Sequence, residues 1–210
     1  LLRWGLIPHW AKDVKTGYKM INARAETVAD KPSFRDAFQH RRCLIPATGF
    51  YEWKPIKGGK QPYHIRIGKG GLFAFAGLWA SWDDPASGER VRTCTIVTGR
   101  PNDLVAGIHD RMPVILGETS WDQWLDRAEE DPAAVTRLLE VHSADQMAVH
   151  PVSTLVNSVA NNLPECIEPL EKIVLYFLLR EVENELVAGQ KQRRRHDVEY
   201  PVRMRPVEIA

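Results

Sequence analysis

The sequence lacks long apolar runs, and it lacks an excess of charge of one sign. Its longest apolar runs, such as residues 173–179, fall far short of the roughly 20 residues that a membrane-spanning helix needs. Lys and Arg number 28 and Asp and Glu number 27, so the formal net charge is only +1. We therefore expect no membrane partner. Any nucleic-acid site has to be a local basic patch, because no global field attracts a polyanion.

Cysteine is also scarce, and no motif for a metal or a cofactor is present. Cys43, Cys94 and Cys166 form no C-x-x-C pair and leave one unpaired in any disulfide scheme. No secretory signal opens the chain, so a reducing cytoplasm fits best. The histidines and cysteines show no zinc-ligand spacing, and residues 68–71 lack the frame of a phosphate loop. We predict no metal, no cofactor, and buried, inert thiols at Cys43 and Cys94.

What is present is the composition of an ordinary globular protein, with 44% hydrophobic and 26% charged residues. A length of 210 residues, against roughly 150 for a typical domain, predicts one domain with an appendage. Between residues 43 and 116, short β-branched and aromatic runs alternate with glycine turns, which is typical of an antiparallel sheet of hairpins. The expected strands are 49–54 with 63–67, 72–82 with 89–98, and a short strand at 113–116.

Helices are predicted outside this block. The segment 32–40 has a proline near its start and places Phe34, Ala37 and Phe38 on one face. Ser120 and Gln123 fit a capping box, in which the two side chains satisfy amides at the start of a helix. This pattern predicts a helix from Ser120 through residue 127.

The chain beyond residue 130 predicts two further elements and then a boundary. A helix is expected after Asp131, and residues 147–149 are typical of a late strand. Between residues 170 and 187 apolar residues recur at helical spacing, and a basic run follows at 191–195. We expect residues 1–169 to form the domain and residues 170–210 to form an accessory helix and a tail.

The first candidate site lies in the segment 21–27. A strand-like period of two puts Asn22, Arg24 and Glu26 on one face, which offers an amide, a cation and a carboxylate together. Arg24 could clamp a phosphate, while Asn22 positions a reacting polar group. The alternative is a surface ion pair between Arg24 and Glu26 that contributes little energetically.

The second candidate is Glu52, which lies among aromatic residues on an expected central strand. Aromatic packing desolvates a carboxylate and raises its pKa, which suits acid–base work near neutrality. The alternative is a solvated glutamate on an edge strand. Trp53 is either a core residue or a platform on which a nucleobase stacks.

The third candidate is His109, a loop histidine that could accept or donate a proton near neutral pH. Asp110 resembles the orienting partner of a catalytic triad. Adjacent residues on an extended chain point to opposite sides, so Asp110 could orient His109 only if the loop turns back. The alternative is a structural histidine with its hydrogen bonds satisfied.

Four motifs in this order resemble the SOS-response-associated peptidase (SRAP) family. They are RWGLIPHW at 3–10, NARAET at 22–27, CLIP at 43–46 continuing into GFYEW at 49–53, and IHDRMP at 108–113. Supporting segments lie at 75–79, 95–98 and 150–153, so the resemblance extends to about residue 169. It implies an α+β fold around a barrel-like antiparallel sheet with peripheral helices. It also implies a role in DNA repair near the nucleoid. The expected partner is single-stranded DNA that contains abasic sites, and the protein is expected to be a monomer.

The resemblance also implies residue roles. Asn22 would hold the sugar or a terminal cysteine, Glu52 would shuttle protons during ring opening, and His109 would assist proton transfer at the Schiff-base stage. DNA binding would fall to Arg3, Trp4, Arg24, Trp53 and Thr98. In the family the nucleophile is an N-terminal cysteine, whose amine and thiol close a thiazolidine on the sugar aldehyde.

That terminal cysteine is absent, because the sequence begins at Leu1 inside a strand-like run. We interpret the sequence as lacking an N-terminal segment that carries the cysteine, so these residues alone are not expected to crosslink. The alternative is a non-covalent module that binds single-stranded DNA. A third possibility takes the family name literally, as a thiol peptidase that acts on itself, with lyase activity as a further expectation.

Overall fold

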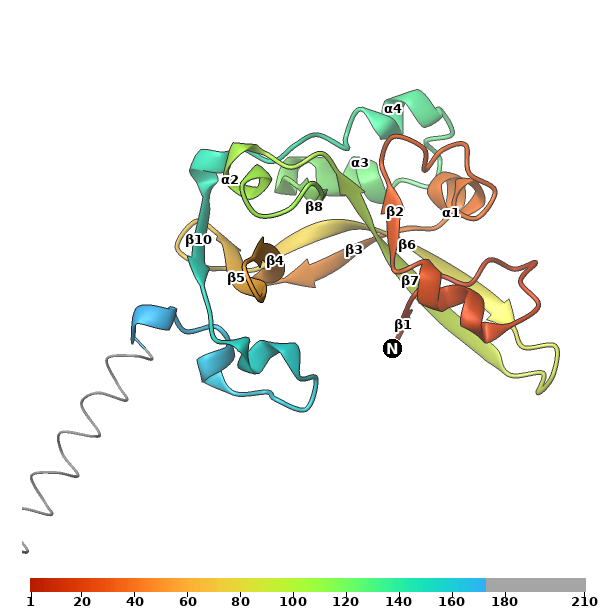
Figure 1. The fold of residues 1–210 in the computed structure, drawn as a ribbon. Coiled ribbons are helices and arrows are strands. Elements are labelled where there is room, and N and C mark those ends of the chain that lie inside the picture. The colour runs from red at the N-terminus through yellow and green to blue at the C-terminus, as the bar shows by residue number, and fades with distance from the viewer. Residues whose placement is uncertain (173–210) are drawn as a thin grey trace, which may run out of the picture.

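The computed structural model describes residues 1–172, which form two β-sheets with short helices around them (Figure 1). The accessory helix predicted at 170–187 lies almost entirely outside the described residues, and the basic run at 191–195 lies wholly outside them. Within residues 1–172, no helix is long and apolar enough to cross a membrane.

The larger sheet has seven strands and is built around one long hairpin. Strands β6 (Phe73–Asp83) and β7 (Arg90–Gly99) pair antiparallel from Gly77 opposite Ile96 to Asp83 opposite Arg90. This confirms the hairpin predicted at 72–98. The other strands are β1 (Arg3–Trp4), β2 (Asn22–Arg24) and β8 (Met112–Pro113) against β7, with β3 (Arg42–Ala47) and β9 (Ile115–Leu116) against β6.

The smaller sheet has three strands in the order β10-β5-β4. Its strands β4 (Phe50–Ile56) and β5 (Gly59–Ile67) form the other predicted hairpin, and β10 (Met147–Pro151) is the late strand expected at 147–149. Gly58 in the turn has a φ of 92°, in the region that favours glycine. The expectation that Glu52 lies on a central strand is wrong, because β4 is the edge of this sheet.

Two other expectations about the sheet are corrected. The strands do not all run antiparallel, because β1 and β2 both pair parallel to β7. The segment between them contains the 3-10 helix η1 (Val14–Lys19) and returns the chain to β7, so β1 and β2 pair with successive stretches of the same strand. No closed barrel is present in residues 1–172, since the strands form two separate sheets and the chain leaves one for the other at Thr48 and Gly49.

Short helices cover the larger sheet. In Figure 1, α1 (Arg35–His40), α3 (Trp121–Leu125) and α4 (Pro132–Thr136) gather near one end of it, whereas α2 (Asp103–Ala106) lies near β8. Phe34, Ala37 and Phe38 are buried, as their spacing predicts. Further 3-10 turns are η2 (Glu118–Ser120), η3 (Ala144–Gln146), η4 (Thr154–Asn157) and η5 (Pro164–Cys166).

The predicted starts of two helices have different outcomes. Asp131 caps α4, since its side chain accepts a hydrogen bond from the Ala133 amide at 2.9 Å. The capping box at Ser120 is wrong, because the Ser120 side chain makes no capping bond and α3 ends at Leu125. The turn η2 runs directly into α3, so Ser120 has helical backbone angles instead of the extended angles of a capping residue.

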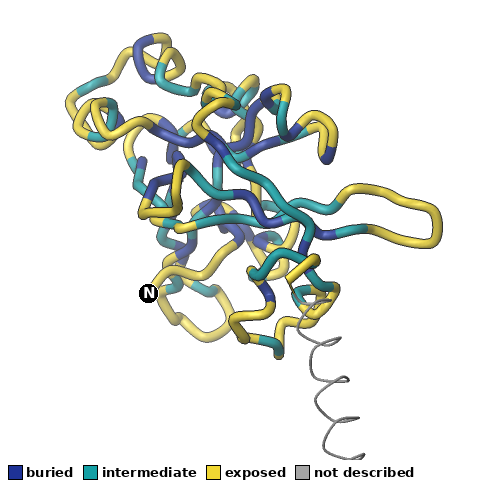
Figure 2. The backbone as a smooth tube through the Cα atoms, turned by 90° about the vertical axis from the view of Figure 1, so that its left-hand side faces the viewer, coloured by how far each residue is buried: buried dark blue, intermediate teal, exposed yellow. Residues whose placement is uncertain are grey.

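Two apolar clusters hold the layers together. The first lies under the helices and includes Leu78 and Trp124; the second includes Ile65 of β5, Phe75 of β6 and Met112 of β8. The second cluster draws on both sheets and therefore fixes the edge strand β4 relative to β7. Figure 2 shows the buried segments gathered in the interior and the exposed ones in the outer loops. Residues 85–90, at the tip of the β6–β7 hairpin, are exposed.

Candidate functional site

A cleft of about 820 Å³ lies between the edge strand β4 and the outward face of β7. Both sheets and the loop after α2 contribute to its walls. Of the eight residues to which the family resemblance assigns a catalytic or DNA-binding role, seven line it: Asn22, Glu52, His109, Trp4, Arg24, Trp53 and Thr98. The structure therefore brings together residues that lie up to about 100 positions apart in the chain.

Strand alternation explains the floor of the cleft. On β2, Ala23 is fully buried while Asn22 and Arg24 are exposed on the other face. The register places Asn22 opposite Ile96 and Arg24 opposite Thr98, and both β7 residues line the cleft. The prediction that Asn22 and Arg24 share one face is confirmed.

Glu26 departs from both interpretations of its segment. Strand β2 ends at Arg24, and a turn follows in which the Thr27 amide bonds the Arg24 carbonyl. Glu26 therefore lies beyond the alternating face and does not line this cleft. It pairs with Arg111 across 85 positions of sequence, not with Arg24. Neither the three-residue face nor the Arg24–Glu26 pair is formed.

Arg3 is the one expected binding residue that does not line the cleft. It precedes Trp4 on β1, so its side chain leaves the opposite face of the strand. Its guanidinium lies over the Tyr18 ring, 5.2 Å from the ring centroid. A role for Arg3 in DNA binding stays a prediction.

Glu52 is largely buried, although β4 is an edge strand. Its side chain is 17% exposed because it points into the cleft, where the neighbouring Phe50 packs edge-on against Phe75 at 5.7 Å. Burial raises the pKa of Glu52 above its ordinary value; the nearby His109 opposes this shift, and Asp110 adds to it. The solvated edge glutamate considered above is therefore not what the structure contains.

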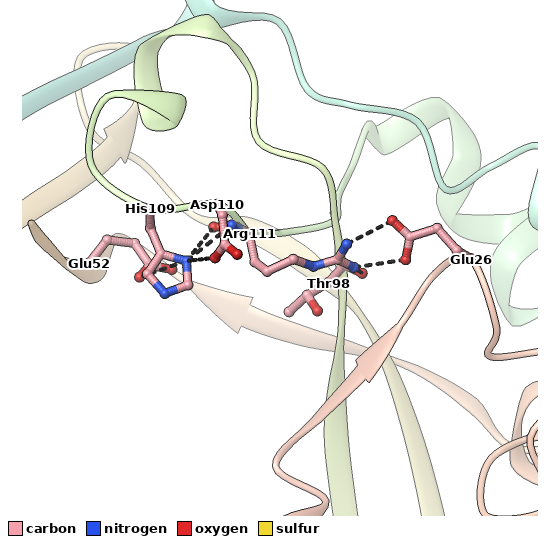
Figure 3. Close-up of polar contacts among 6 residues, drawn as sticks. All are labelled: Glu26, Glu52, Thr98, His109, Asp110 and Arg111. Carbon is pink, nitrogen blue, oxygen red and sulfur yellow. Dashed lines mark hydrogen bonds and ion pairs between the residues drawn. The ribbon is translucent and has the colours of Figure 1, made fainter.

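His109 faces Glu52 from the loop that follows α2 (Figure 3). Its Nδ1 atom lies 3.9 Å from Glu52 Oε2 and 3.3 Å from Asp110 Oδ1. The Arg111 amide donates to the same Nδ1 at 3.0 Å, and the Arg111 carbonyl oxygen lies 3.2 Å from it. Nδ1 accepts a hydrogen bond from the Arg111 amide in one tautomer and can donate to the neighbouring oxygens in the other.

Asp110 corrects the sequence-based view of this loop. The chain does turn back, so the Asp110 carboxylate reaches His109 even though the two residues are adjacent. The Asp110 side chain is 90% exposed, and solvent screens its interaction with the imidazole. The half-buried partner in this group is Glu52.

Arg111 is a site residue that the sequence analysis did not single out. Its guanidinium makes a two-pronged ion pair with Glu26, at 2.7 and 2.9 Å, and also donates to the Thr98 carbonyl oxygen. The Arg111 hydrogen bond is the largest cause that lowers the pKa of Glu26 to about 2. The sequence signal for Arg111 was its place in the same motif as His109. Its charge is opposite to that of Glu26, which lies 85 residues earlier.

Tryptophans form the rim of the cleft. Trp4 is 57% exposed, and its indole N–H donates to the Ile21 carbonyl at 2.8 Å. The Trp53 indole N–H donates to Asn157 Oδ1 at 2.7 Å, and its ring lies 6.2 Å from that of Tyr51. Trp53 is thus a cleft residue outside the apolar clusters of the core, and its rim position suits stacking against a planar group.

Three thiols were also considered in the sequence. Cys43, Cys94 and Cys166 are all free, and Cys94 lines the cleft. Burial raises the pKa of Cys43 to about 12 and raises that of Cys94. Both sit on strands as predicted, although they are half-buried. Among residues 1–172, no three His, Cys, Asp or Glu side chains gather as metal ligands would.

Comparison with known families and proteins gives consistent matches. The family described as SOS response associated peptidase (SRAP) matches residues 1–159. A Bacillus subtilis protein named abasic site processing protein YoqW is 53% identical over 168 residues, covering 80% of this chain and 75% of that protein. The chicken abasic site processing protein HMCES is 37% identical over 193 residues, covering 81% of this chain and 57% of that protein.

Solved structures resemble the fold as well. A crystal structure of a Bacteroides thetaiotaomicron protein superposes with a TM-score of 0.73 at 30% identity, over 80% of this chain and 75% of that one. A Bordetella bronchiseptica protein superposes with a TM-score of 0.63 at 29% identity, over 72% and 76% of the two chains.

Proposed function

The chain belongs to the SOS response associated peptidase (SRAP) family, and we propose that it processes abasic sites in DNA, capturing them covalently in single strands. Relatives at 53% and 37% identity carry the name abasic site processing protein. The observation that carries the proposal is the meeting of Asn22, Glu52 and His109 in one cleft from three separate segments, with Glu52 mostly buried.

The rim and floor of the cleft suit a single strand. Trp4 and Trp53 offer indole faces on which unpaired bases stack, an interaction that tolerates any sequence. Arg24 has a planar fork that matches a phosphate. A net charge of +1 fits local contacts of this kind better than a broad basic face.

The chemistry expected from the family resemblance starts from the ring-opened sugar of an abasic site, which has an aldehyde. The amine of a terminal cysteine condenses with that aldehyde to an imine and releases one water. The thiol then adds to the imine carbon, and its proton passes to the nitrogen, which closes a thiazolidine. Each step moves protons, so it needs a group that both holds and releases them near neutral pH.

Glu52 and His109 supply that need in this chain. The raised pKa of Glu52 keeps a fraction of its carboxyl protonated, so it can donate to the sugar oxygen as the ring opens. His109 Nδ1, 3.9 Å from Glu52 Oε2, can pass a proton at the imine stage. Asn22, on the floor opposite Ile96, can hold the sugar or the cysteine by hydrogen bonds.

The experiment uses the protein expressed from its complete reading frame and a labelled single strand with one abasic site. A heat-stable band on a denaturing gel is expected. A strand with a tetrahydrofuran in place of the abasic sugar has no aldehyde and should give no band. Absence of any adduct from the complete protein would refute the covalent proposal.

A polypeptide of the 210 residues separates covalent capture from simple binding. Leu1 stands at its amino end, and its three cysteines are internal, so it offers no amine beside a thiol. It should bind the abasic strand without forming a heat-stable band. A stable adduct formed by this polypeptide would refute the assigned nucleophile. Binding alone from both forms would instead favour a non-covalent single-strand-binding module.

A further inference from the structure

The two-pronged pair between Glu26 and Arg111 lies beside the cleft and is not part of the chemistry described above. Glu26 follows the end of β2, and Arg111 precedes β8, so the pair ties two segments that flank β7 (Figure 3). The Arg111 guanidinium also donates to the Thr98 carbonyl at the end of β7. Two partners, the Glu26 carboxylate and the Thr98 carbonyl, thus hold the Arg111 side chain.

The backbone of the same arginine holds the imidazole. The Arg111 amide donates to His109 Nδ1 at 3.0 Å, and this is the atom nearest to Glu52. Fixing the Arg111 side chain therefore fixes the peptide that orients His109. A chain of contacts runs from Glu26 through Arg111 to His109, which faces Glu52 at 3.9 Å.

The pair also controls where a positive charge lies. Arg111 lines the cleft, its side chain is only 24% exposed, and its Nε atom is buried without a hydrogen-bond partner among the described residues. Such a guanidinium needs an anion close by. Glu26 supplies one that stays ionised down to a pH of about 2, the value to which its pKa is lowered.

We propose that Glu26 is a positioning residue for abasic-site capture, which acts through Arg111 to hold His109 beside Glu52 and to keep the Arg111 charge away from Glu52. The inference rests on the proposed function. It makes Glu26 responsible for the geometry and electrostatics of proton transfer, while Glu26 itself contacts neither DNA nor the reacting atoms.

Loss of the Glu26 charge has two consequences. The loop that carries His109 loses its anchor, and misplacement of a catalytic group by about 1 Å can slow a reaction by about 10²-fold. The released guanidinium can also turn toward Glu52, a carboxylate that lines the same cleft. A cation there favours the ionised form and lowers the pKa of Glu52.

The test compares Glu26→Gln with the parental protein, both in the complete reading frame. Crosslinking rates are measured under single turnover from pH 5 to 9, and affinity is measured with the unreactive tetrahydrofuran strand. We expect the rate to fall about tenfold or more, with the limb that reports Glu52 displaced to lower pH. Affinity should stay within about twofold of the parental value or increase, because a negative charge near the cleft is removed.

Asp83→Asn is the matched control. Asp83 and Arg90 form a similar two-pronged pair, at 2.7 and 3.2 Å, at the exposed tip of the β6–β7 hairpin away from the cleft. Its removal should change neither rate nor pH profile. Glu26→Asp keeps the charge on a shorter side chain and should recover part of the rate; it also serves if Glu26→Gln fails to fold.

The outcomes are distinct. A parental rate and pH profile in Glu26→Gln would overturn the inference while leaving the proposed function intact. Equal losses of rate and affinity would overturn it too, by showing that Glu26 serves DNA binding. A parental protein that forms no adduct would instead refute the proposed function itself.

Discussion

Glu52 and Glu26 lie on either side of the loop that carries His109, and their surroundings drive their pKa values in opposite directions. Glu52, on the smaller sheet, loses solvent without gaining an arginine, so its pKa rises. Glu26, beside the larger sheet, accepts two hydrogen bonds from the Arg111 guanidinium, and its pKa falls to about 2. Opposite pKa shifts of this kind suit different roles, and we propose Glu52 as a proton carrier and Glu26 as a fixed charge.

The difference between the two pKa shifts depends on the groups that surround each carboxylate. Strand β4 presents Glu52 to a cleft in which His109 Nδ1 lies 3.9 Å from its carboxylate. The turn after β2 instead presents Glu26 to a permanent cation at 2.7 Å. The same residue type is thus available for protonation in one place and held ionised in the other. The experiments below test this division, beginning with the largest expected effect.

Replacement of Glu52 by glutamine should have the greatest effect on rate. Gln keeps the shape but carries no titrating proton, so crosslinking by the complete protein should slow by about 10²-fold or more. Glu118→Gln, at an exposed turn, is the control and should be silent. A parental rate in Glu52→Gln would show that Glu52 is a structural strand residue and carries no proton in the reaction.

Truncation of Trp53, the neighbour of Glu52, should separate binding from proton transfer. If a base stacks on this rim indole, Trp53→Ala should weaken single-strand binding by about 1 to 3 kcal/mol. Its crosslinking rate at saturating DNA should fall much less than that of Glu52→Gln. Fluorescence anisotropy with a labelled strand measures the affinity, and intact duplex of the same sequence is the comparison. Equal affinity for duplex and single strand would place the binding site elsewhere.

Stability at neutral pH should change in opposite directions in the two glutamine variants. The lowered pKa of Glu26 means that its contribution is present above its ordinary pKa of 4.5 and is lost as the pH falls toward 2. Glu26→Gln should therefore destabilise the protein at pH 7, by about 1 kcal/mol since the pair is partly exposed to solvent.

Glu52 should behave in the reverse manner. A raised carboxyl pKa contributes stability at low pH that is lost as the pH rises through the folded-state value. Glu52→Gln should therefore match or exceed the parental stability at pH 7. Urea unfolding of the 210-residue polypeptide and its variants at pH 4 and pH 7 measures whether each substitution raises or lowers the free energy of unfolding. Destabilisation of both variants at pH 7 would contradict the opposed environments.

The smallest effect concerns Arg24, a cation of the cleft that, unlike Arg111, has no ion-pair partner among residues 1–172. If Arg24 meets one phosphate, Arg24→Gln should reduce the salt dependence of single-strand binding by about 0.7 in the log–log slope. The loss should be alike for every sequence. Arg90→Gln, at the distant hairpin tip, is the control, and an equal change in both would show that only net charge matters.

Local sequence signals predicted much of this fold. The two long hairpins follow from glycine turns between alternating strands, and the helix at 32–40 from the spacing of its apolar face. The division into two sheets and the parallel edges β1 and β2 were missed, because pairing between distant strands leaves no local pattern. Ser120 shows the converse failure, since a local pattern is present but a preceding turn overrides it.

For the site, too, local features could be predicted from the sequence and contacts between distant segments could not. Asn22, Glu52 and His109 could be named from the chemistry of their motifs, and the structure brings all three to one cleft. The Glu26–Arg111 pair spans 85 positions and could not be found from spacing. Desolvation of Glu52 was expected from its aromatic neighbours, but on a central strand; its burial on an edge strand depends on the packing of Phe50 against a different sheet.

The most direct measurement is a carboxyl titration by NMR. Carbon-13 shifts of the glutamate side chains in the folded 210-residue polypeptide, followed from pH 2 to 8 and assigned with the two glutamine variants, report each group separately. The account predicts that Glu52 titrates above its ordinary value of 4.5 and that Glu26 titrates near 2. Titration of both groups together near 4.5, or of Glu52 below Glu26, would contradict the division of the two carboxylates into a proton carrier and a fixed charge.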